Sequence, residues 1–128
     1  MPAEWESSDA WVFASISGSG IGDGTTLTQV IAAADANNHA IMTEEEFTRA
    51  IARLIKAGLV GADIAADRYW YAEAGQDLWA RRMKRRGLFG WIEAIPPALR
   101  RLGPPQDGDW PLPPGAFDQA VRDYLSRV

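Results

Sequence analysis

The side chains whose types and spacing could do chemistry are concentrated in one short basic stretch. Residues 81–101 contain seven Lys or Arg against the single acidic Glu93, and five of the seven lie in the run Arg81, Arg82, Lys84, Arg85 and Arg86. Cations this close repel one another, so a polyanion such as nucleic acid, or an acidic protein surface, would stabilise them. The acidic residues 1–80 could also supply that surface, within the chain or in a second subunit.

Catalytic and metal-binding chemistry has little support elsewhere. His39 is the only histidine, and its neighbours 35–38 and 44–46 offer no second His, no Cys and no carboxylate pair at ligand spacing. The glycine-rich loop 18–24 has no third glycine at the fingerprint position and no following Lys-Ser or Lys-Thr, so it matches neither a dinucleotide-binding nor a phosphate-binding loop. We therefore expect no enzyme activity, no cofactor and no metal.

Composition indicates one small domain. The chain has 128 residues, 47% of them apolar and six of them Trp, which suits a single hydrophobic core. No apolar run approaches the roughly 20 residues of a membrane span, the N-terminal segment is acidic, and there is no cysteine. We expect a cytoplasmic protein without disulfides.

Charge is distributed unevenly along the chain. Residues 1–80 carry 4 basic and 12 acidic side chains, whereas residues 81–128 carry 9 basic and 5 acidic ones. The net charge of −4 does not exclude a polyanion as partner, because screening makes such an interaction local to the basic face. The composition permits a nucleic-acid partner without requiring one.

Apolar periodicity and capping residues predict three helices in the first half. Residues 7–17 form the first, although their apolar run would also suit a strand. Thr25 or Thr26 caps a second helix whose apolar face is Leu27, Val30, Ile31 and Ala34. We expect its terminal turn at Asn37 and Asn38, which tolerate the left-handed conformation.

The third helix has the clearest signals. Thr43 and Glu46 form a capping box that opens a helix over residues 44–57, and Gly58 ends it. Its predicted buried face is Phe47, Ala50, Ile51, Leu54 and Ile55.

A hairpin and further helices are expected after it. Residues 59–63 and 68–72 are predicted strands, with Tyr69 and Tyr71 on one face and Trp70 on the other. A fourth helix runs from Glu73 towards Arg86, and a helical stretch over 88–102 must be kinked or broken at Pro96–Pro97.

The C-terminal quarter divides into three parts. A domain over residues 1–102 is followed by a Pro- and Gly-rich extended linker at 103–115 and by an amphipathic helix at 116–128. That helix packs either on the domain or on a second subunit. Trp110, isolated in the linker, either anchors the linker to the domain or docks on a partner.

The predicted order of elements is that of a winged helix-turn-helix domain, and two motifs resemble its regulators. The run over residues 42–60 resembles the recognition helix and first wing strand of MarR-like and PadR-like proteins, with Leu54, Gly58, Leu59 and Val60 in the L-x-x-x-G-L-[VI] pattern. Residues 69–78 resemble their Y-x-L-T-x-x-G-x-x-L pattern, with Tyr71 in place of Leu and Ala72 in place of the capping Thr. The resemblance covers residues 7–86.

The resemblance implies a mostly α-helical winged helix-turn-helix domain with a small β-hairpin and a C-terminal helical extension. In that superfamily the third helix enters the major groove, and its solvent-facing positions here would be Glu45, Thr48, Arg49, Ala52, Arg53 and Lys56. The DNA-binding candidates are therefore Thr48, Arg49, Arg53, Lys56, Arg68, Arg81, Arg82, Lys84, Arg85 and Arg86. The implied function is a DNA-binding transcriptional regulator acting as a homodimer on double-stranded DNA.

Two features oppose that reading. Residues 44–46 are three carboxylates at the end of the helix that approaches base edges, where they would repel phosphates. Arg68 is the only base of the predicted wing, beside Asp63 and Asp67. The alternative is a winged-helix module that binds a protein partner and not DNA.

Overall fold

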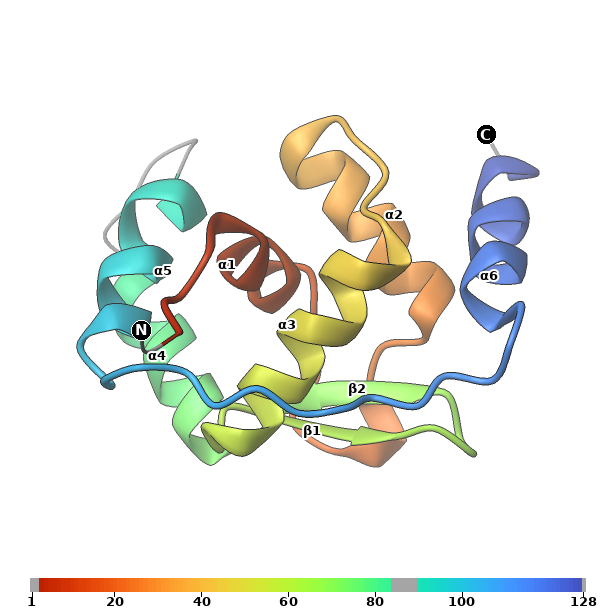
Figure 1. Cartoon of the computed structure of the whole chain (residues 1–128). Helices are drawn as coiled ribbons and strands as arrows, with labels where there is room; N and C mark the ends of the chain where they lie inside the picture. Colours follow the sequence, from red (N-terminus) through yellow and green to blue (C-terminus); the bar gives the residue numbers. More distant parts are fainter. Residues whose placement is uncertain (1–2, 84–89, 128) are drawn as a thin grey trace.

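Three N-terminal helices pack around a shared apolar centre, and a β-hairpin lies along one side of it (Figure 1). The computed structural model describes residues 3–83 and 90–127, without the side chains of residues 82, 83 and 91. The predicted mostly helical fold with one two-stranded hairpin is confirmed. The elements are α1 (Ser7–Ala14), the short 3-10 helix η1 (Ile21–Asp23), α2 (Leu27–Asn38), α3 (Glu44–Lys56), β1 (Val60–Asp63), β2 (Arg68–Tyr71), α4 (Glu73–Met83), α5 (Gly90–Arg100) and α6 (Ala116–Leu125).

Helix α1 contacts α2, α3 and α5, and this position explains its ambiguous sequence. A helix covered on several sides buries consecutive residues rather than a narrow stripe. Trp11, Val12 and Phe13 are all buried, and the indole Nε1 of Trp11 donates to the carbonyl oxygen of Ala34 at 2.9 Å. The segment is therefore a helix, although its apolar run also suited a strand.

Helices α2 and α3 begin with the predicted caps. The backbone N–H of Glu46 donates to Thr43 Oγ1 at 3.1 Å, and the Thr43 N–H donates to Glu46 Oε1 at 2.8 Å. Thr26 and Gln29 form the same reciprocal pair at the start of α2. These bonds satisfy N–H groups that have no partner inside the helix.

The two helix ends differ in how well they were predicted. Gly58 follows α3 with φ +76°, as its role in ending that helix requires. The predicted turn at Asn37 and Asn38 is wrong, because both lie in α2 and His39 takes the left-handed conformation instead, with φ +53°. Asn37 is held in the helix, where its Nδ2 donates to the carbonyl oxygen of Ala14 at 3.3 Å.

Strand β2 pairs on both of its edges. On one edge it pairs antiparallel with β1, in a register that sets Val60 opposite Tyr71 and Asp63 opposite Arg68. On the other edge Thr25 and Tyr69 exchange two backbone hydrogen bonds of 2.7 and 2.8 Å. A short extended piece between α1 and α2 thus adds to the hairpin, and β2 is central.

The inward face of β2 carries aromatic side chains into the core. Tyr69 and Tyr71 lie on one face of β2, as predicted, and both are buried. Trp70 on the opposite face lies over Gly61. The Phe47 ring meets the Tyr69 ring edge-on at 5.3 Å between centroids. The Tyr71 hydroxyl donates to the carbonyl oxygen of Phe13 at 2.5 Å, which connects the hairpin to α1.

Helix α5 runs through both prolines. The sequence predicted a kink or break at Pro96–Pro97, but Gly90–Arg100 is one assigned helix, so a break there is wrong. Because proline has no N–H group, Pro96 and Pro97 cannot donate the usual helical hydrogen bonds to the carbonyls four residues before them. Ile92 and Glu93 are exposed residues, so water can reach that side of the helix, while Ile95 and Leu99 pack into the core.

Residues 103–115, which we call the strap, form the extended segment that the composition predicted. The strap crosses the outer side of the α3 C-terminal half and the hairpin before it reaches α6 (Figure 1). Helix α6 packs on α2 of the same chain, with Phe117 and Ala120 buried. The strap and α6 therefore wrap one side of the domain.

Candidate functional site on the outer face of α3

Four of the DNA-binding candidates lie on α3, and they differ sharply in exposure. Lys56 is exposed, and Thr48 and Arg49 are half-buried. Arg53 is only 5% exposed and Ala52 only 4% exposed, so the prediction that these two positions face solvent is wrong. Arg53 is covered from two sides, because Glu4 and Asp9 near the N-terminus and Asp107 of the strap all bind it.

Arg53 lies between two carboxylates from opposite ends of the chain. Its Nη1 donates to Asp9 Oδ2 at 2.9 Å, and its Nε donates to Asp107 Oδ1 at 2.7 Å. Nη1 also donates to the carbonyl oxygen of Glu4 at 3.0 Å. A guanidinium suits this position because its fixed, planar set of donors can serve several acceptors at once.

Asp9 is fully buried and bound on one oxygen only. Its Oδ2 accepts from Arg53 and from the backbone N–H of Glu6 at 2.8 Å, which also caps the start of α1. Its Oδ1 has no partner among the described residues. Burial away from water raises the pKa of Asp9 above its ordinary value of 3.8, although the bonds to Glu6 and Arg53 partly oppose that rise.

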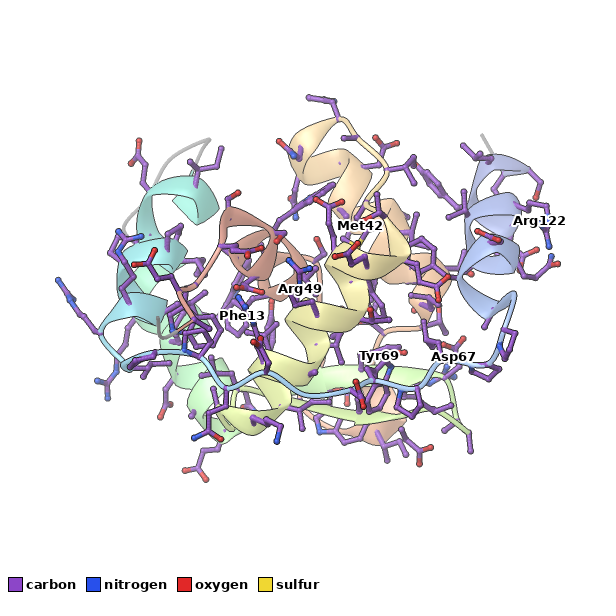
Figure 2. All side chains as sticks on the ribbon, viewed as in Figure 1. Phe13, Met42, Arg49, Asp67, Tyr69 and Arg122 are labelled. Atoms are coloured by element: carbon purple, nitrogen blue, oxygen red, sulfur yellow. The ribbon has the colours of Figure 1, made fainter. Side chains whose placement is uncertain are left out.

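The strap has a second anchor at Trp110. Its indole Nε1 donates to the Tyr69 hydroxyl at 3.0 Å, and the two rings meet edge-on at 5.9 Å between centroids. Burial raises the pKa of Tyr69 to about 12. Trp110 thus anchors the strap to the domain, which was one of the two roles predicted for it. Figure 2 shows Tyr69 and Arg49 on the side of the molecule that the strap crosses.

Further contacts fix both ends of the strap. Trp5 Nε1 donates to the carbonyl oxygen of Gly103 at 2.8 Å, and Pro105 is buried. Gly108 lies so close to the Lys56 side chain that a Cβ there would collide with it. Beyond the strap, the Tyr124 hydroxyl on α6 donates to Asp35 Oδ2 at 2.6 Å. The segment is held at several points by side chains.

The remaining polar side chains of α3 bond mainly to neighbours. Arg49 forms ion pairs with Glu6, at 3.3 Å, and with Glu45. The Thr48 hydroxyl donates to the carbonyl oxygen of Glu44 at 3.0 Å, within its own helix. Among the described residues, Lys56 alone of the three α3 cations has no ion pair.

An open hollow of about 540 Å³ lies between α3 and the strap. Glu45, Thr48, Arg49 and Arg53 line its α3 side, and residues 107–111 line the other. Two strap carboxylates, Asp107 and Asp109, therefore border the surface that a DNA-reading helix would present to phosphates. This is where sequence reasoning placed base contacts.

Arg68, the DNA-binding candidate in the hairpin, bonds to the backbone of the hairpin itself. Its Nη1 donates to the carbonyl oxygen of Asp67 at 3.0 Å. Asp67 Oδ1 accepts from the backbone N–H of Leu27 at 3.0 Å, and Asp63 Oδ1 accepts from Ala66 N–H at 3.0 Å. The acidic side chains of the hairpin tip therefore accept hydrogen bonds from backbone N–H groups of the turn and of the start of α2.

The basic run is only partly described. Arg81 is exposed on α4, and it lines a hollow of about 260 Å³ between α4 and α5 together with Arg101 and Asp77. Arg82 lies in α4, but its side chain is outside the description, and Lys84, Arg85 and Arg86 lie outside the described residues. The structure brings Arg81 towards α5 and not towards α3.

Sequence reasoning missed the roles of Asp9 and Asp107. A partial signal existed for Asp9, because it follows Glu6 by three residues at a helix start, the spacing of a capping residue. For Asp107 the signal was weaker, since it is one of two acids in a linker. Neither pattern indicates Arg53 as the partner.

Searches for related proteins do not add a family. Comparison with protein-family models, curated proteins and solved structures found no match to this chain. The described residues contain no group of three His, Asp or Glu that could hold a metal ion. None of the described helices has the length and apolar character needed to cross a bilayer.

Proposed function

We propose that this chain is a winged-helix protein-interaction module whose third helix binds an extended acidic protein segment and not duplex DNA. The winged-helix assignment is supported by the order of the elements, which is α1, the short extended piece at Thr25, α2, α3, β1 and β2. A winged-helix domain has its elements in the same order, with the second strand of the hairpin in the centre of the sheet, as β2 is here. Helix α3, whose sequence resembles a recognition helix, is the helix that the strap contacts.

One observation carries the proposal: Arg53, the central cation of α3, is buried between Asp9 and Asp107. A guanidinium used in this way has few donors left for a guanine edge or a phosphate. Releasing it for DNA would leave Asp9 buried without its counter-ion, which costs several kcal/mol in typical proteins. The geometry favours protein carboxylates as its ligands.

The charge around α3 supports the same reading. Glu6 and Glu45 pair with Arg49, and the strap aspartates Asp107 and Asp109 border the hollow beside it. DNA affinity depends strongly on cations that neutralise phosphates, and each such contact contributes to the salt dependence. With the strap in place this face has a surplus of acidic groups, so the many phosphates of duplex DNA would be repelled at short range. A protein segment that replaces the strap removes Asp107 and Asp109 from this face and supplies its own carboxylate to Arg53.

Fluorescence anisotropy with a labelled mixed-sequence duplex across a salt series tests the proposal. Two matched double variants each remove two positive charges: Arg49→Gln with Lys56→Gln on α3, and Arg81→Gln with Arg101→Gln on α4 and α5. We expect the α3 variant to leave any duplex affinity unchanged within about twofold, because α3 makes no phosphate contact. Circular dichroism of both variants checks that each is folded.

The outcomes separate the two classes of protein. Loss of binding in the α3 variant, with the slope of log affinity against log salt reduced by about 2, would overturn the proposal. Absence of duplex binding by the wild type at low salt would support it. Binding that is lost only in the α4–α5 variant would also leave the α3 face free of DNA.

The last outcome belongs to a second candidate function, a DNA-binding regulator that contacts phosphate through α4 and α5. The exposed side chains of Arg81, Arg100 and Arg101 favour it, together with the basic composition of residues 81–86. The homodimer and the transcriptional role implied by the sequence resemblance would go with this candidate.

A further inference from the structure

We infer that the α3 face accepts a segment of another protein in place of the strap, and that this segment carries a carboxylate three residues before a Trp within a Pro-rich stretch. The inference rests on the proposed function and names its partner class. The strap is then an intramolecular occupant that the partner must displace.

Two anchors on the domain define the ligand chemistry. Arg53 binds one carboxylate of the strap through Nε at 2.7 Å, and the Tyr69 hydroxyl accepts from the indole of Trp110 at 3.0 Å. Asp107 and Trp110 are three residues apart, so an extended segment with the same spacing reaches both anchors. The carboxylate provides charge pairing and the indole provides a large apolar contact with one donor.

The prolines of the strap fit this mode of binding. Pro104, Pro105 and Pro111 flank the two anchor residues, and Pro105 is itself buried. Proline restricts the free segment to extended conformations, so less conformational entropy is lost on binding than for a flexible chain. A partner with the same composition would gain the same advantage.

The strap is attached in a way that permits exchange. In the part of the chain that the structure describes, no backbone–backbone hydrogen bond joins residues 104–111 to the helices or the hairpin, and the attachment is through side chains and packing. Asp107 is 63% exposed although it pairs with Arg53. Gly103 and Gly115 bound the strap with φ near +90° and +82°, and a Cβ at either would meet nothing, so the chain there is unobstructed.

A labelled synthetic peptide of residues 103–113 is the probe, because it carries the proposed ligand chemistry. The receptor is the full chain with Asp107→Asn and Trp110→Ala, which weaken the strap without altering the α3 face. The wild-type chain and an Asp109→Asn variant are the controls. Asp109→Asn removes the same charge two residues away, where the structure gives Asp109 no ion pair.

We expect the loosened variant to bind the peptide at least about tenfold more tightly than wild type or Asp109→Asn, because the tethered strap competes at a high effective concentration. A peptide with the Asp107→Asn and Trp110→Ala changes should lose that binding. If circular dichroism shows that the double variant is unfolded, Asp107→Asn alone is used. We then expect the same ranking, with Asp107→Asn binding the peptide more tightly than wild type or Asp109→Asn.

Absence of peptide binding to a folded, loosened variant would overturn the inference. Dimerisation of that variant in place of peptide binding would overturn it as well, because the occupant would then be a second copy of this chain. Duplex DNA measured with the same samples separates the two proposals. Duplex binding by the loosened variant that depends on Arg49 and Lys56 would contradict the proposed function itself.

Discussion

At the scale of single residues, the two ion pairs of Arg53 leave its guanidinium few donors for any other group. Asp9 is fully buried, and Asp107 is largely exposed, so the two partners contribute differently. Removing one partner from a buried pair is costly because it leaves an uncompensated charge, whereas an exposed partner adds little. The Asp9 side is therefore structural, and the Asp107 side is exchangeable.

Replacement of Asp9 by Asn should change how stability depends on pH. Because burial raises the pKa of Asp9 above 3.8, the folded state holds the proton more tightly than the unfolded state. The tighter binding of this proton adds to the free energy of unfolding. Its contribution is complete below about pH 3.8 and is lost as pH rises through the pKa of Asp9 in the folded state. We expect the free energy of unfolding of wild type, relative to Asp9→Asn, to fall as pH rises in that window.

Urea unfolding of both proteins at intervals between about pH 3.5 and 7 measures this difference. An advantage of the wild type that grows with pH would contradict the prediction. It would mean that pairing with Arg53 outweighs desolvation and that the pKa of Asp9 is depressed.

Tyr69 gives a prediction at alkaline pH. Its pKa is raised from 10.0 to about 12 by burial, so the unfolded chain ionises first. Its contribution to stability is complete below pH 10 and is lost as pH rises through the folded-state pKa, an effect on the order of 2 kcal/mol. We expect Tyr69→Phe to lose less stability above pH 10 than wild type, and to be about 1 kcal/mol less stable at neutral pH because Trp110 loses its acceptor.

Thermal unfolding and the ultraviolet absorbance of ionised tyrosine report both effects. A Tyr69 phenol that titrates at its ordinary pKa in the folded wild type would contradict the buried position behind the strap.

At the scale of elements, the strap and the α3 helix end behave differently under substitution. The strap is held by a few side chains, whereas the end of α3 is set by backbone conformation at Gly58. Disturbing the strap should therefore cost little more than its individual contacts, while disturbing the helix end should cost backbone strain.

The strap contacts should contribute unequally to stability. Trp110→Ala removes a half-buried indole and its hydrogen bond, and we expect a loss of about 1–3 kcal/mol. Asp107→Asn should cost at most about 1 kcal/mol because the pair is largely exposed, and Asp109→Asn should cost about zero. Urea unfolding of the three variants tests this order, and an Asp109 effect equal to that of Asp107 would contradict the assigned ion pair.

Gly58 supports the end of α3 through its left-handed conformation. A Cβ there would meet no neighbouring atom, so Gly58→Ala would test backbone strain alone, at about 1–2 kcal/mol. Gly22→Ala is the matched control, since its site is equally open and its φ is not positive. Equal thermal midpoints for the two variants would contradict the helix end described here.

Local signals in the sequence were sufficient to predict the capping residues and the hairpin. Thr43 with Glu46, and Gly58 after α3, act within a few residues, so their roles follow from spacing. The burial of Arg53 could not be predicted in the same way. Its partners lie 44 and 54 residues away along the chain, and only the tertiary fold brings them together. The sequence therefore could not predict that the face of α3 expected to bind DNA is partly covered by distant segments of the same chain.

At the scale of the whole molecule, the strap and α6 cover the outer side of an acidic domain. Helix α6 was expected to need a partner for its apolar face, and α2 of the same chain contacts that face. This weakens the structural reason for a homodimer, which stays a prediction. The described positive charge at Arg81, Arg100 and Arg101 lies on α4 and the end of α5, apart from the α3 face.

Nuclear magnetic resonance of the wild-type chain tests the central claim, that the strap occupies the α3 face, most directly. The indole proton of Trp110, assigned with a Trp110→Phe variant, should show a nuclear Overhauser effect to the Tyr69 ring, because its nitrogen lies 3.0 Å from the Tyr69 hydroxyl. The Arg53 Nε–H should be protected from exchange and should shift in Asp107→Asn. An indole that exchanges rapidly with water and shows no effect to Tyr69 would contradict the account and would return α3 to the surfaces open to DNA.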